Sequence, residues 1–175
     1  MKTLVVYYSR KGSNRFLAQK IANELNCDIE EIRPRLNVFL FFLMRISLGI
    51  KALKHDVRTY DRVIMCGPIW VGQLITPHQS FIRRYRKKIK KLVFVTCCGS
   101  SYEEKDNKFG HNIVFNKLKD DLKETCSHCA AFPIPILVAE DKRKDGETIM
   151  NTRMNNDTFH GEVKEKFETF IMSLN

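Results

Sequence analysis

Residues 3–14, TLVVYYSRKGSN, decide the fold of this chain. The segment opens with an apolar, β-branched and aromatic run from Thr3 to Tyr8, and it turns polar around Gly12. A continuous run of this kind predicts a strand buried on both faces, as strands of parallel sheets are. An apolar stripe at helical spacing follows, formed by Leu17, Ala18, Ile21, Ala22 and Leu25. The segment therefore predicts a strand, a polar loop and a helix in succession.

The rest of the chain repeats this alternation. Further strands are predicted at residues 28–32, 61–66, 92–97 and 130–138, and further helices at 77–91, 110–127 and 163–174. Pro133 and Pro135 place the last strand at a sheet edge, and residues 139–157 are predicted to be a charged loop. The alternation predicts a single α/β domain over residues 1–175, with a doubly wound parallel sheet covered by helices on both faces.

Composition limits the classes of protein that this chain can be. Of its 175 residues 43% are hydrophobic, and 30 Lys and Arg against 20 Asp and Glu give a formal net charge of +10. This apolar fraction excludes a disordered or collagen-like chain. The N-terminal apolar run is too short for a signal peptide, so a cytoplasmic location is expected. Residues 36–50 are apolar, but Arg45 interrupts them and they are too short to span a membrane.

The positive charge invites a nucleic-acid or membrane interpretation. Its main cluster, residues 83–91, is explained as the solvated end of a surface helix, and no base-reading element is evident, so nucleic-acid binding is not expected. Residues 36–50 are expected to be a helix buried against the domain, a hydrophobic cap over a site or an interfacial segment. In the last case their apolar side chains and basic flanks suit an anionic membrane surface, to which the protein would bind peripherally.

Ligands of doubly wound sheets bind beyond the carboxyl ends of the strands. The first loop at that edge, residues 9–14, leads from a strand into a helix, so its N–H groups and the helix dipole favour an anion there. Gly12 permits close approach, and Ser9, Ser13 and Asn14 supply further donors. The loop is neither a Walker A motif nor a dinucleotide fingerprint. The same residues also fit a plain helix cap at Ser13 or Asn14.

This loop resembles the FMN-phosphate loop of the flavodoxin family, S/T-x-T-G-N/S-T, in sequence and in position. The matching residues are Ser9, Arg10, Lys11, Gly12, Ser13 and Asn14. Lys11 and Asn14 stand where the family usually has threonine. The resemblance implies that these residues hold the phosphate of FMN.

The second loop at this edge resembles the family's G-x-P-x-W/Y-x-G loop. It contains Gly67, Pro68, Ile69, Trp70, Val71 and Gly72. Trp70, the single tryptophan, offers the largest face on which a planar isoalloxazine could stack. The resemblance implies that a backbone carbonyl beside Gly72 turns toward flavin N5 when that atom gains a proton. Trp70 would otherwise be a large buried residue.

The third loop gives a looser match. It follows the strand at residues 92–97, and the resemblance implies that Cys98, Gly99 and Tyr102 lie at the other edge of the flavin. Tyr102 is a candidate for a second stacking ring. Adjacent cysteines at a strand end are more often small apolar fillers than redox groups.

The resemblance implies a five-stranded flavodoxin-like sheet in the order 2-1-3-4-5 that binds FMN, with residues 35–56 as an insertion or cap between the second and third strands. The protein would be an electron-transfer protein or a small FMN-dependent oxidoreductase linked to a quinone or NAD(P)H. Its partner would be a redox protein or a quinone-like or nicotinamide substrate, and the chain would be a monomer or homodimer. Alternatively, it is a basic binding module for an acidic protein, an anionic membrane or nucleic acid, and its flavin site is vestigial. The two hypotheses differ in whether the protein binds FMN.

Other chemistries find less support in the residues. A phosphoreceiver domain needs acidic residues where this chain has Tyr8-Ser9 and Cys66-Gly67. No general acid, general base or metal site stands out. Cys126 and Cys129 have C-x-x-C spacing, which suits zinc or a redox dithiol, but no second ligand pair is evident and the spacing is taken as incidental.

Overall fold

The computed structural model describes residues 1–35, 49–99 and 110–174. Its centre is a five-stranded parallel sheet with the strand order β2-β1-β3-β6-β7. The strands are β1 (Thr3–Tyr7), β2 (Asp28–Glu31), β3 (Arg62–Cys66), β6 (Leu92–Cys98) and β7 (Cys126–Pro133). The predicted order and the parallel sheet are confirmed.

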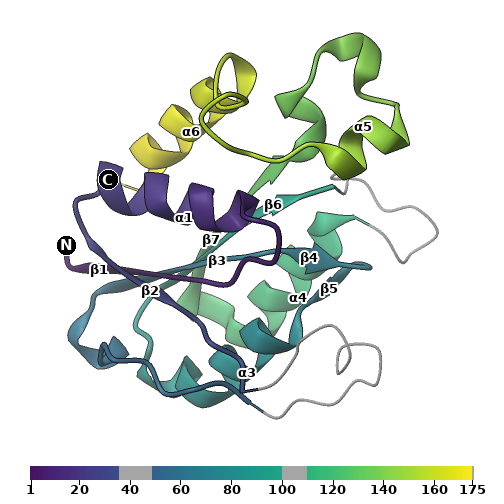
Figure 1. Cartoon of the computed structure of the whole chain (residues 1–175). Helices are drawn as coiled ribbons and strands as arrows, with labels where there is room; N and C mark the ends of the chain where they lie inside the picture. Colours follow the sequence, from purple (N-terminus) through teal and green to yellow (C-terminus); the bar gives the residue numbers. More distant parts are fainter. Residues whose placement is uncertain (36–48, 100–109, 175) are drawn as a thin grey trace.

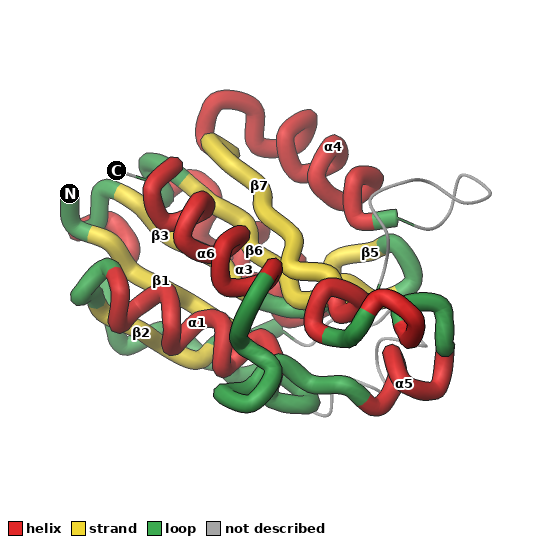
Figure 2. The backbone as a smooth tube through the Cα atoms, turned by 90° about the horizontal axis from the view of Figure 1, so that it is seen from above, coloured by secondary structure: helices red, strands yellow, loops and turns green. Residues whose placement is uncertain are grey.

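Helices cover both faces of the sheet (Figures 1 and 2). One face carries α1 (Ser13–Glu24) and α6 (Glu162–Ser173), and the other carries α3 (Thr76–Tyr85) and α4 (His111–Leu122). A short helix, α5 (Gly146–Asn151), precedes α6. Five 3₁₀ turns lie at Val57–Thr59, Arg86–Lys88, Lys123–Thr125, Ile134–Leu137 and Glu140–Lys142.

Alternating side chains of the central strands build two cores. Val5 and Ile64 point toward α1 and α6, whereas Leu4, Val6 and Met65 point toward α3 and α4. Every residue of β3 and β6 is buried. This burial on both faces explains why the strands are continuous apolar runs. Because the sheet is packed between two layers of helices, the ends of β1, β3 and β6 are held beside one another.

Several predicted boundaries are wrong. The helix predicted at 77–91 ends at Tyr85, because Ile89 turns back into the core and the intervening cations form a 3₁₀ turn. The last strand spans Cys126–Pro133 rather than 130–138, so α4 before it ends at Leu122 and a 3₁₀ turn, Ile134–Leu137, follows it. That strand lies at a sheet edge, as predicted.

The region predicted to be a charged loop, 139–157, contains α5. The side chain of Asp145 caps this helix by accepting hydrogen bonds from the N–H groups of Glu147 and Thr148. Within the described residues, no helix has both the length and the apolar character that crossing a membrane requires.

The predicted insertion, 35–56, falls partly outside the described residues, which omit 36–48. Its described part packs against α3. The N–H group of Leu53 donates to the hydroxyl of Tyr85 at 3.1 Å, and Arg84 donates to the carbonyl of Ile50 at 3.2 Å. Residues 49–54 therefore lie on the same side of the sheet as α3.

Candidate functional site

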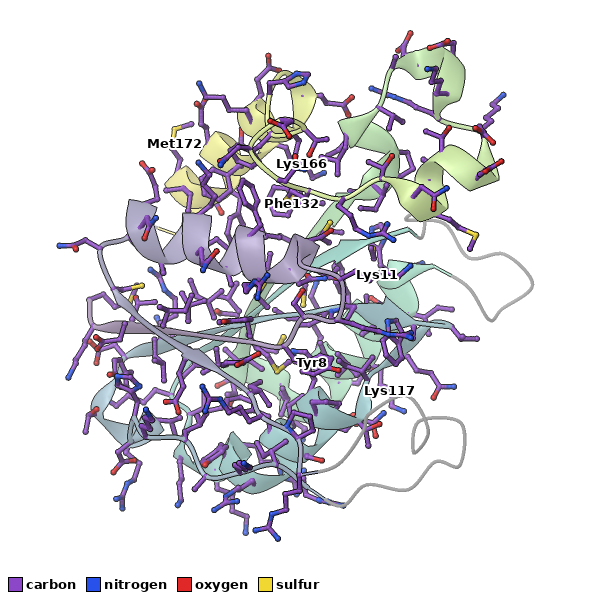
Figure 3. All side chains as sticks on the ribbon, in the orientation of Figure 1. Tyr8, Lys11, Lys117, Phe132, Lys166 and Met172 are labelled. Atoms are coloured by element: carbon purple, nitrogen blue, oxygen red, sulfur yellow. The ribbon has the colours of Figure 1, made fainter. Side chains whose placement is uncertain are left out.

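The carboxyl ends of β1, β3 and β6 form one continuous edge. The N–H group of Tyr8, just after β1, donates to the carbonyl of Cys66 at 3.1 Å, and that of Gly67, just after β3, donates to the carbonyl of Val95 at 3.0 Å. All three predicted loops begin at this edge. Figure 3 labels Tyr8, which precedes the first of these loops, and Lys11, which belongs to it.

The first loop turns into α1 at Gly12. Gly12 has φ +98°, a conformation that other residues rarely adopt, and a Cβ placed on it would meet nothing within 4 Å. Because α1 begins at Ser13, the N–H groups of residues 13–15 have no partner inside the helix. Such donors and the positive end of a helix dipole favour a phosphate, and the space beside Gly12 is open.

The alternative helix cap at Ser13 or Asn14 is wrong, because the cap residue is Gly12 and no side chain caps the helix. The Asn14 side chain is buried and binds the main chain of Cys97, 83 residues away. Its Nδ2 donates to the Cys97 carbonyl at 2.9 Å, and its Oδ1 accepts from the Cys97 N–H group at 2.8 Å. Asn14 therefore ties the first loop to the end of β6.

Ser13 is also turned inward. Its hydroxyl oxygen accepts from the N–H group of Met154 at 3.1 Å and thereby fastens the chain before α6 to the first loop. The Ser9 hydroxyl accepts from the N–H group of Gly12 at 3.1 Å and stays half-buried. Side chains that were predicted as phosphate donors thus serve partly to hold the loop, which leaves the main-chain N–H groups as the candidate anion donors.

The second loop is a two-residue hairpin. Its strands, β4 (Ile69–Trp70) and β5 (Gln73–Leu74), are antiparallel. Val71 and Gly72 at the tip have φ values of 50° and 63°. Both values are positive, as a type I′ turn requires, but a β-branched valine is strained in this region. The side chain of Val71 is 64% exposed, so the strain has no compensation from burial.

Trp70 is half-buried, and Ile69 beside it belongs to the core. The Arg10 guanidinium lies 5.7 Å from the centre of the Trp70 ring, a cation–π distance. This contact joins the first loop to the second and sets a positive charge beside the predicted stacking residue. Pro68 and Gly72 are half-buried next to it.

His78 is a residue of this region that the sequence did not reveal. It is completely buried at the start of α3, and its Nε2 donates to the carbonyl of Cys66 at 3.2 Å. Burial lowers the pKa of His78 to about 4, although the Cys66 hydrogen bond acts in the opposite direction. A Cβ at residue 67 would overlap the imidazole, so only glycine fits there. This contact spans two elements, and no local pattern signals it.

The third loop is described only at its start. Cys98 is buried, and its Sγ lies 3.9 Å from Nδ1 of His111, so this side chain packs under α4. Gly99 is exposed at the edge. The predicted contact from Tyr102 lies outside the described residues. The main chain of residues 98 and 99 stays a prediction as the second flank of a flavin.

Comparisons with known proteins agree with this architecture. No family model matches the chain. A flavoprotein from Lactobacillus acidophilus, solved in complex with FMN, superposes with a TM-score of 0.61 and 17% identity, over 74% of this chain and 92% of its own. A short-chain flavodoxin associated with a non-canonical PDU bacterial microcompartment has a TM-score of 0.51 and 13% identity, over 99% of this chain and 97% of its own.

One relative is found by sequence. An uncharacterized protein of Archaeoglobus fulgidus is 24% identical over 105 residues, which are 59% of this chain and 70% of that protein. The sheet order and the superpositions together define the class: this chain has the flavodoxin-like α/β fold.

Proposed function

We propose that this chain binds FMN noncovalently at the carboxyl edge of the sheet and transfers electrons through it. The observation that carries the proposal is that three loops from distant parts of the sequence are joined there. Asn14 binds Cys97 through two hydrogen bonds, and Arg10 lies against Trp70. The likeness of the fold to a flavoprotein solved with FMN supports the same conclusion.

The chemistry of the edge fits the two ends of FMN. The phosphate dianion suits the helix N-terminus, where Gly12 leaves open space and Arg10 and Lys11 add positive charge. We place the planar ring against Trp70, with the main chain at Gly99 as its second flank. When bound, the flavin supplies one- and two-electron transfer, and the protein supplies position and electrostatics.

The residues of the second loop would orient the ring. Trp70 offers a flat apolar face. The peptide between Val71 and Gly72 can turn, since glycine populates both signs of φ, and its carbonyl would accept a hydrogen bond from flavin N5 when that atom carries a proton. His78 is sealed in the core with its pKa well below neutrality, so we assign it no acid or base role. Electron exchange with a redox protein, a quinone or a nicotinamide fits this edge better than hydrolysis.

Titration of the purified chain with FMN and with riboflavin, which lacks the phosphate, tests the proposal. FMN fluorescence should be quenched on binding, and FMN should bind about tenfold more tightly or better, a difference of about 1.4 kcal/mol. Gly12→Ala should weaken FMN binding and leave riboflavin binding unchanged. Gly146→Ala is the matched control, because it lies at an exposed helix start with open space around it. A chain that quenches neither flavin would refute the proposal.

A second candidate function rests on the distribution of charge. Residues 49–61 and 83–91 together contain ten Lys and Arg but two Asp. Both carboxylates are already paired, Asp56 with Arg58 and Asp61 with Lys90. We call these two segments the basic face; they adjoin through the contacts of residues 50 and 53 with α3.

We propose that the basic face binds an anionic membrane surface. Exposed lysines near such a surface contribute about 1 kcal/mol each, and the face includes exposed Lys51, Lys54, Lys87 and Lys88. Co-sedimentation with vesicles of phosphatidylcholine, with and without phosphatidylserine, tests this at low and at physiological salt. Binding should require phosphatidylserine and weaken with salt.

The matched variants carry the same loss of charge on opposite sides of the sheet. Lys87→Gln with Lys88→Gln should weaken vesicle binding. Lys164→Gln with Lys166→Gln, on α6, should leave it unchanged; Figure 3 labels Lys166 on that opposite side. Equal binding by both double variants, or equal binding to neutral vesicles, would overturn the membrane proposal and leave FMN binding untouched.

A further inference from the structure

The start of β7 contains an irregularity that brings two cysteines together. Leu92 of β6 pairs with Cys126, but the next residue, Val93, pairs with His128, so Ser127 is an extra residue. In a regular strand, residues three apart point to opposite faces. A bulge of one residue cancels that offset and puts Cys126 and Cys129 on the same face.

The contacts on both faces of the sheet agree with this geometry. Cys126 and Cys129 belong to the core beneath α4, and their Sγ atoms are 3.6 Å apart. His128 points the other way and stacks on Phe170 of α6, with ring centres 5.9 Å apart. The C-x-x-C spacing, which the sequence left without a role, is thus a pair of thiols in contact.

The two thiols differ in their readiness to ionise. The hydrogen bond from Cys129 lowers the pKa of Cys126, and Lys119 of α4 acts in the same direction. The same hydrogen bond raises the pKa of Cys129, which therefore keeps its proton. Cys129 is half-buried and Cys126 is 7% exposed. The pKa order, not exposure, makes Cys126 the sulfur that attacks and Cys129 the one that follows. Because Cys126 is buried, only a small disulfide could reach it.

This pair is separate from the proposed flavin edge. Cys126 lies beside Leu92, the first residue of β6, whereas the candidate site lies beyond Cys98, the last. Six steps along a strand correspond to about 20 Å. Direct chemistry with a flavin at that edge is therefore a poor explanation of the pair. Among the described residues, no group of three metal-binding side chains is present.

We propose that Cys126 and Cys129 form a thiol–disulfide exchange site whose substrate is a small disulfide of the glutathione type. The Cys126 sulfur attacks one sulfur of the substrate, whose S–S bond breaks and releases the first thiol. Cys129 then attacks the Cys126 sulfur of the mixed disulfide and releases the second thiol. The two cysteines lose two electrons and two protons, and the substrate gains them as two thiols.

Thiol mapping in buffers of reduced and oxidised glutathione tests this site on the full chain, without added flavin. Samples are quenched with an alkylating agent, and peptides are identified by mass. We expect a Cys126–Cys129 disulfide in buffers that leave Cys27 unmodified. Cys27 is the control thiol because it is also half-buried but stands alone, and burial raises its pKa to about 11.

Variants define the order of the two steps. Cys129→Ser should stop at a mixed disulfide of Cys126 with glutathione, and Cys126→Ser should form no internal disulfide. Cys27→Ser should behave as the unchanged chain does. If Cys126 and Cys129 both stay free in the most oxidising buffer, or if Cys27 reacts before them, the proposal is wrong. The map of the unchanged chain decides this even if a variant fails to fold.

Discussion

The first and second loops of the candidate site both contain a residue with positive φ, but the residue that adopts it differs. In the first, the positive φ falls on Gly12, which adopts it freely, and buried bonds from Asn14 hold the loop. In the second, a positive φ falls on Val71, which is β-branched and 64% exposed. The first loop is preformed and unstrained, whereas the tip of the second stores strain at the surface.

This difference suits the two ends of the proposed ligand. A phosphate keeps its charge and shape, so a fixed cradle serves it best. A flavin ring changes its hydrogen-bonding pattern as it gains electrons and protons, so a hairpin that can move serves it better. Elements with few buried contacts open at low free-energy cost, and the hairpin tip is such an element. Substitutions in the rigid first loop and in the strained second loop should therefore change stability in different ways.

The largest expected effect is a loss of folding stability at low pH, caused by His78, which packs against Gly67 at the start of the second loop. His78 has a folded-state pKa of about 4 against an ordinary value of 6.5, so the folded protein binds fewer protons than the unfolded chain between these values. Stability from neutral His78 is complete above pH 6.5 and is lost as pH falls toward 4, by about 3 kcal/mol. Urea unfolding from pH 7.5 to 4 measures it.

The control for this prediction is His78→Gln, which keeps a hydrogen-bond donor but does not titrate. The pKa of His128 is also lowered by burial, so the loss due to His78 is the difference between the two unfolding curves. Parallel curves for the unchanged chain and His78→Gln would show that His78 does not couple pH to the second loop.

The next effect breaks the anchor of the first loop. Asn14→Ala removes both bonds to Cys97 and leaves a buried N–H group without its partner. We expect the free energy of unfolding to fall by about 2 kcal/mol. Ser9→Ala, in the same loop, removes a half-buried bond to Gly12 and should cost about 0.5 kcal/mol. If the two variants lose equal stability, the first loop is not anchored through Asn14.

A smaller effect of opposite sign is expected at the hairpin tip. Val71→Asn places a residue that tolerates positive φ before Gly72 and creates the Asn-Gly pair that type I′ turns favour. We expect the free energy of unfolding to rise by about 1 kcal/mol. Val71→Ala, which keeps the unfavourable φ, should gain less. A loss of stability in Val71→Asn, measured by urea unfolding, would show that the valine is not strained.

The sequence predicted those parts of the molecule that depend on local pattern. The apolar run at residues 3–8 predicted the strand, and the stripe from Leu17 to Leu25 predicted the helix. A strand buried on both faces is a continuous apolar run, whereas a helix buried on one face has apolar residues three or four positions apart. The alternation of such units was enough for the parallel sheet, and the resemblance supplied its order. The three loops were also placed at the correct edge.

Contacts between distant elements escaped prediction. Asn14 suggested a helix cap, and nothing near it in the sequence points to Cys97. His78 meets Gly67 because α3 returns beneath the end of β3. The start of the last strand was placed too late because the helix before it was predicted to continue to residue 127, whereas α4 ends at Leu122 and β7 begins at Cys126. These features depend on tertiary structure, which the local sequence pattern does not reveal.

The smallest expected effect concerns the positive electrostatic potential around both loops and its influence on the reduction potential of the flavin. This prediction depends on FMN binding. Arg10 lies over Trp70, and the chain carries a net charge of +10. Positive charge stabilises an added electron, so the second one-electron potential of the bound flavin should lie higher than in an acidic flavodoxin and should fall as salt screens the charges. Redox titration at two ionic strengths measures this shift. Arg10→Gln should lower the potential more than Lys166→Gln on α6, because only Arg10 lies at the proposed ring site; equal shifts would assign the effect to net charge instead.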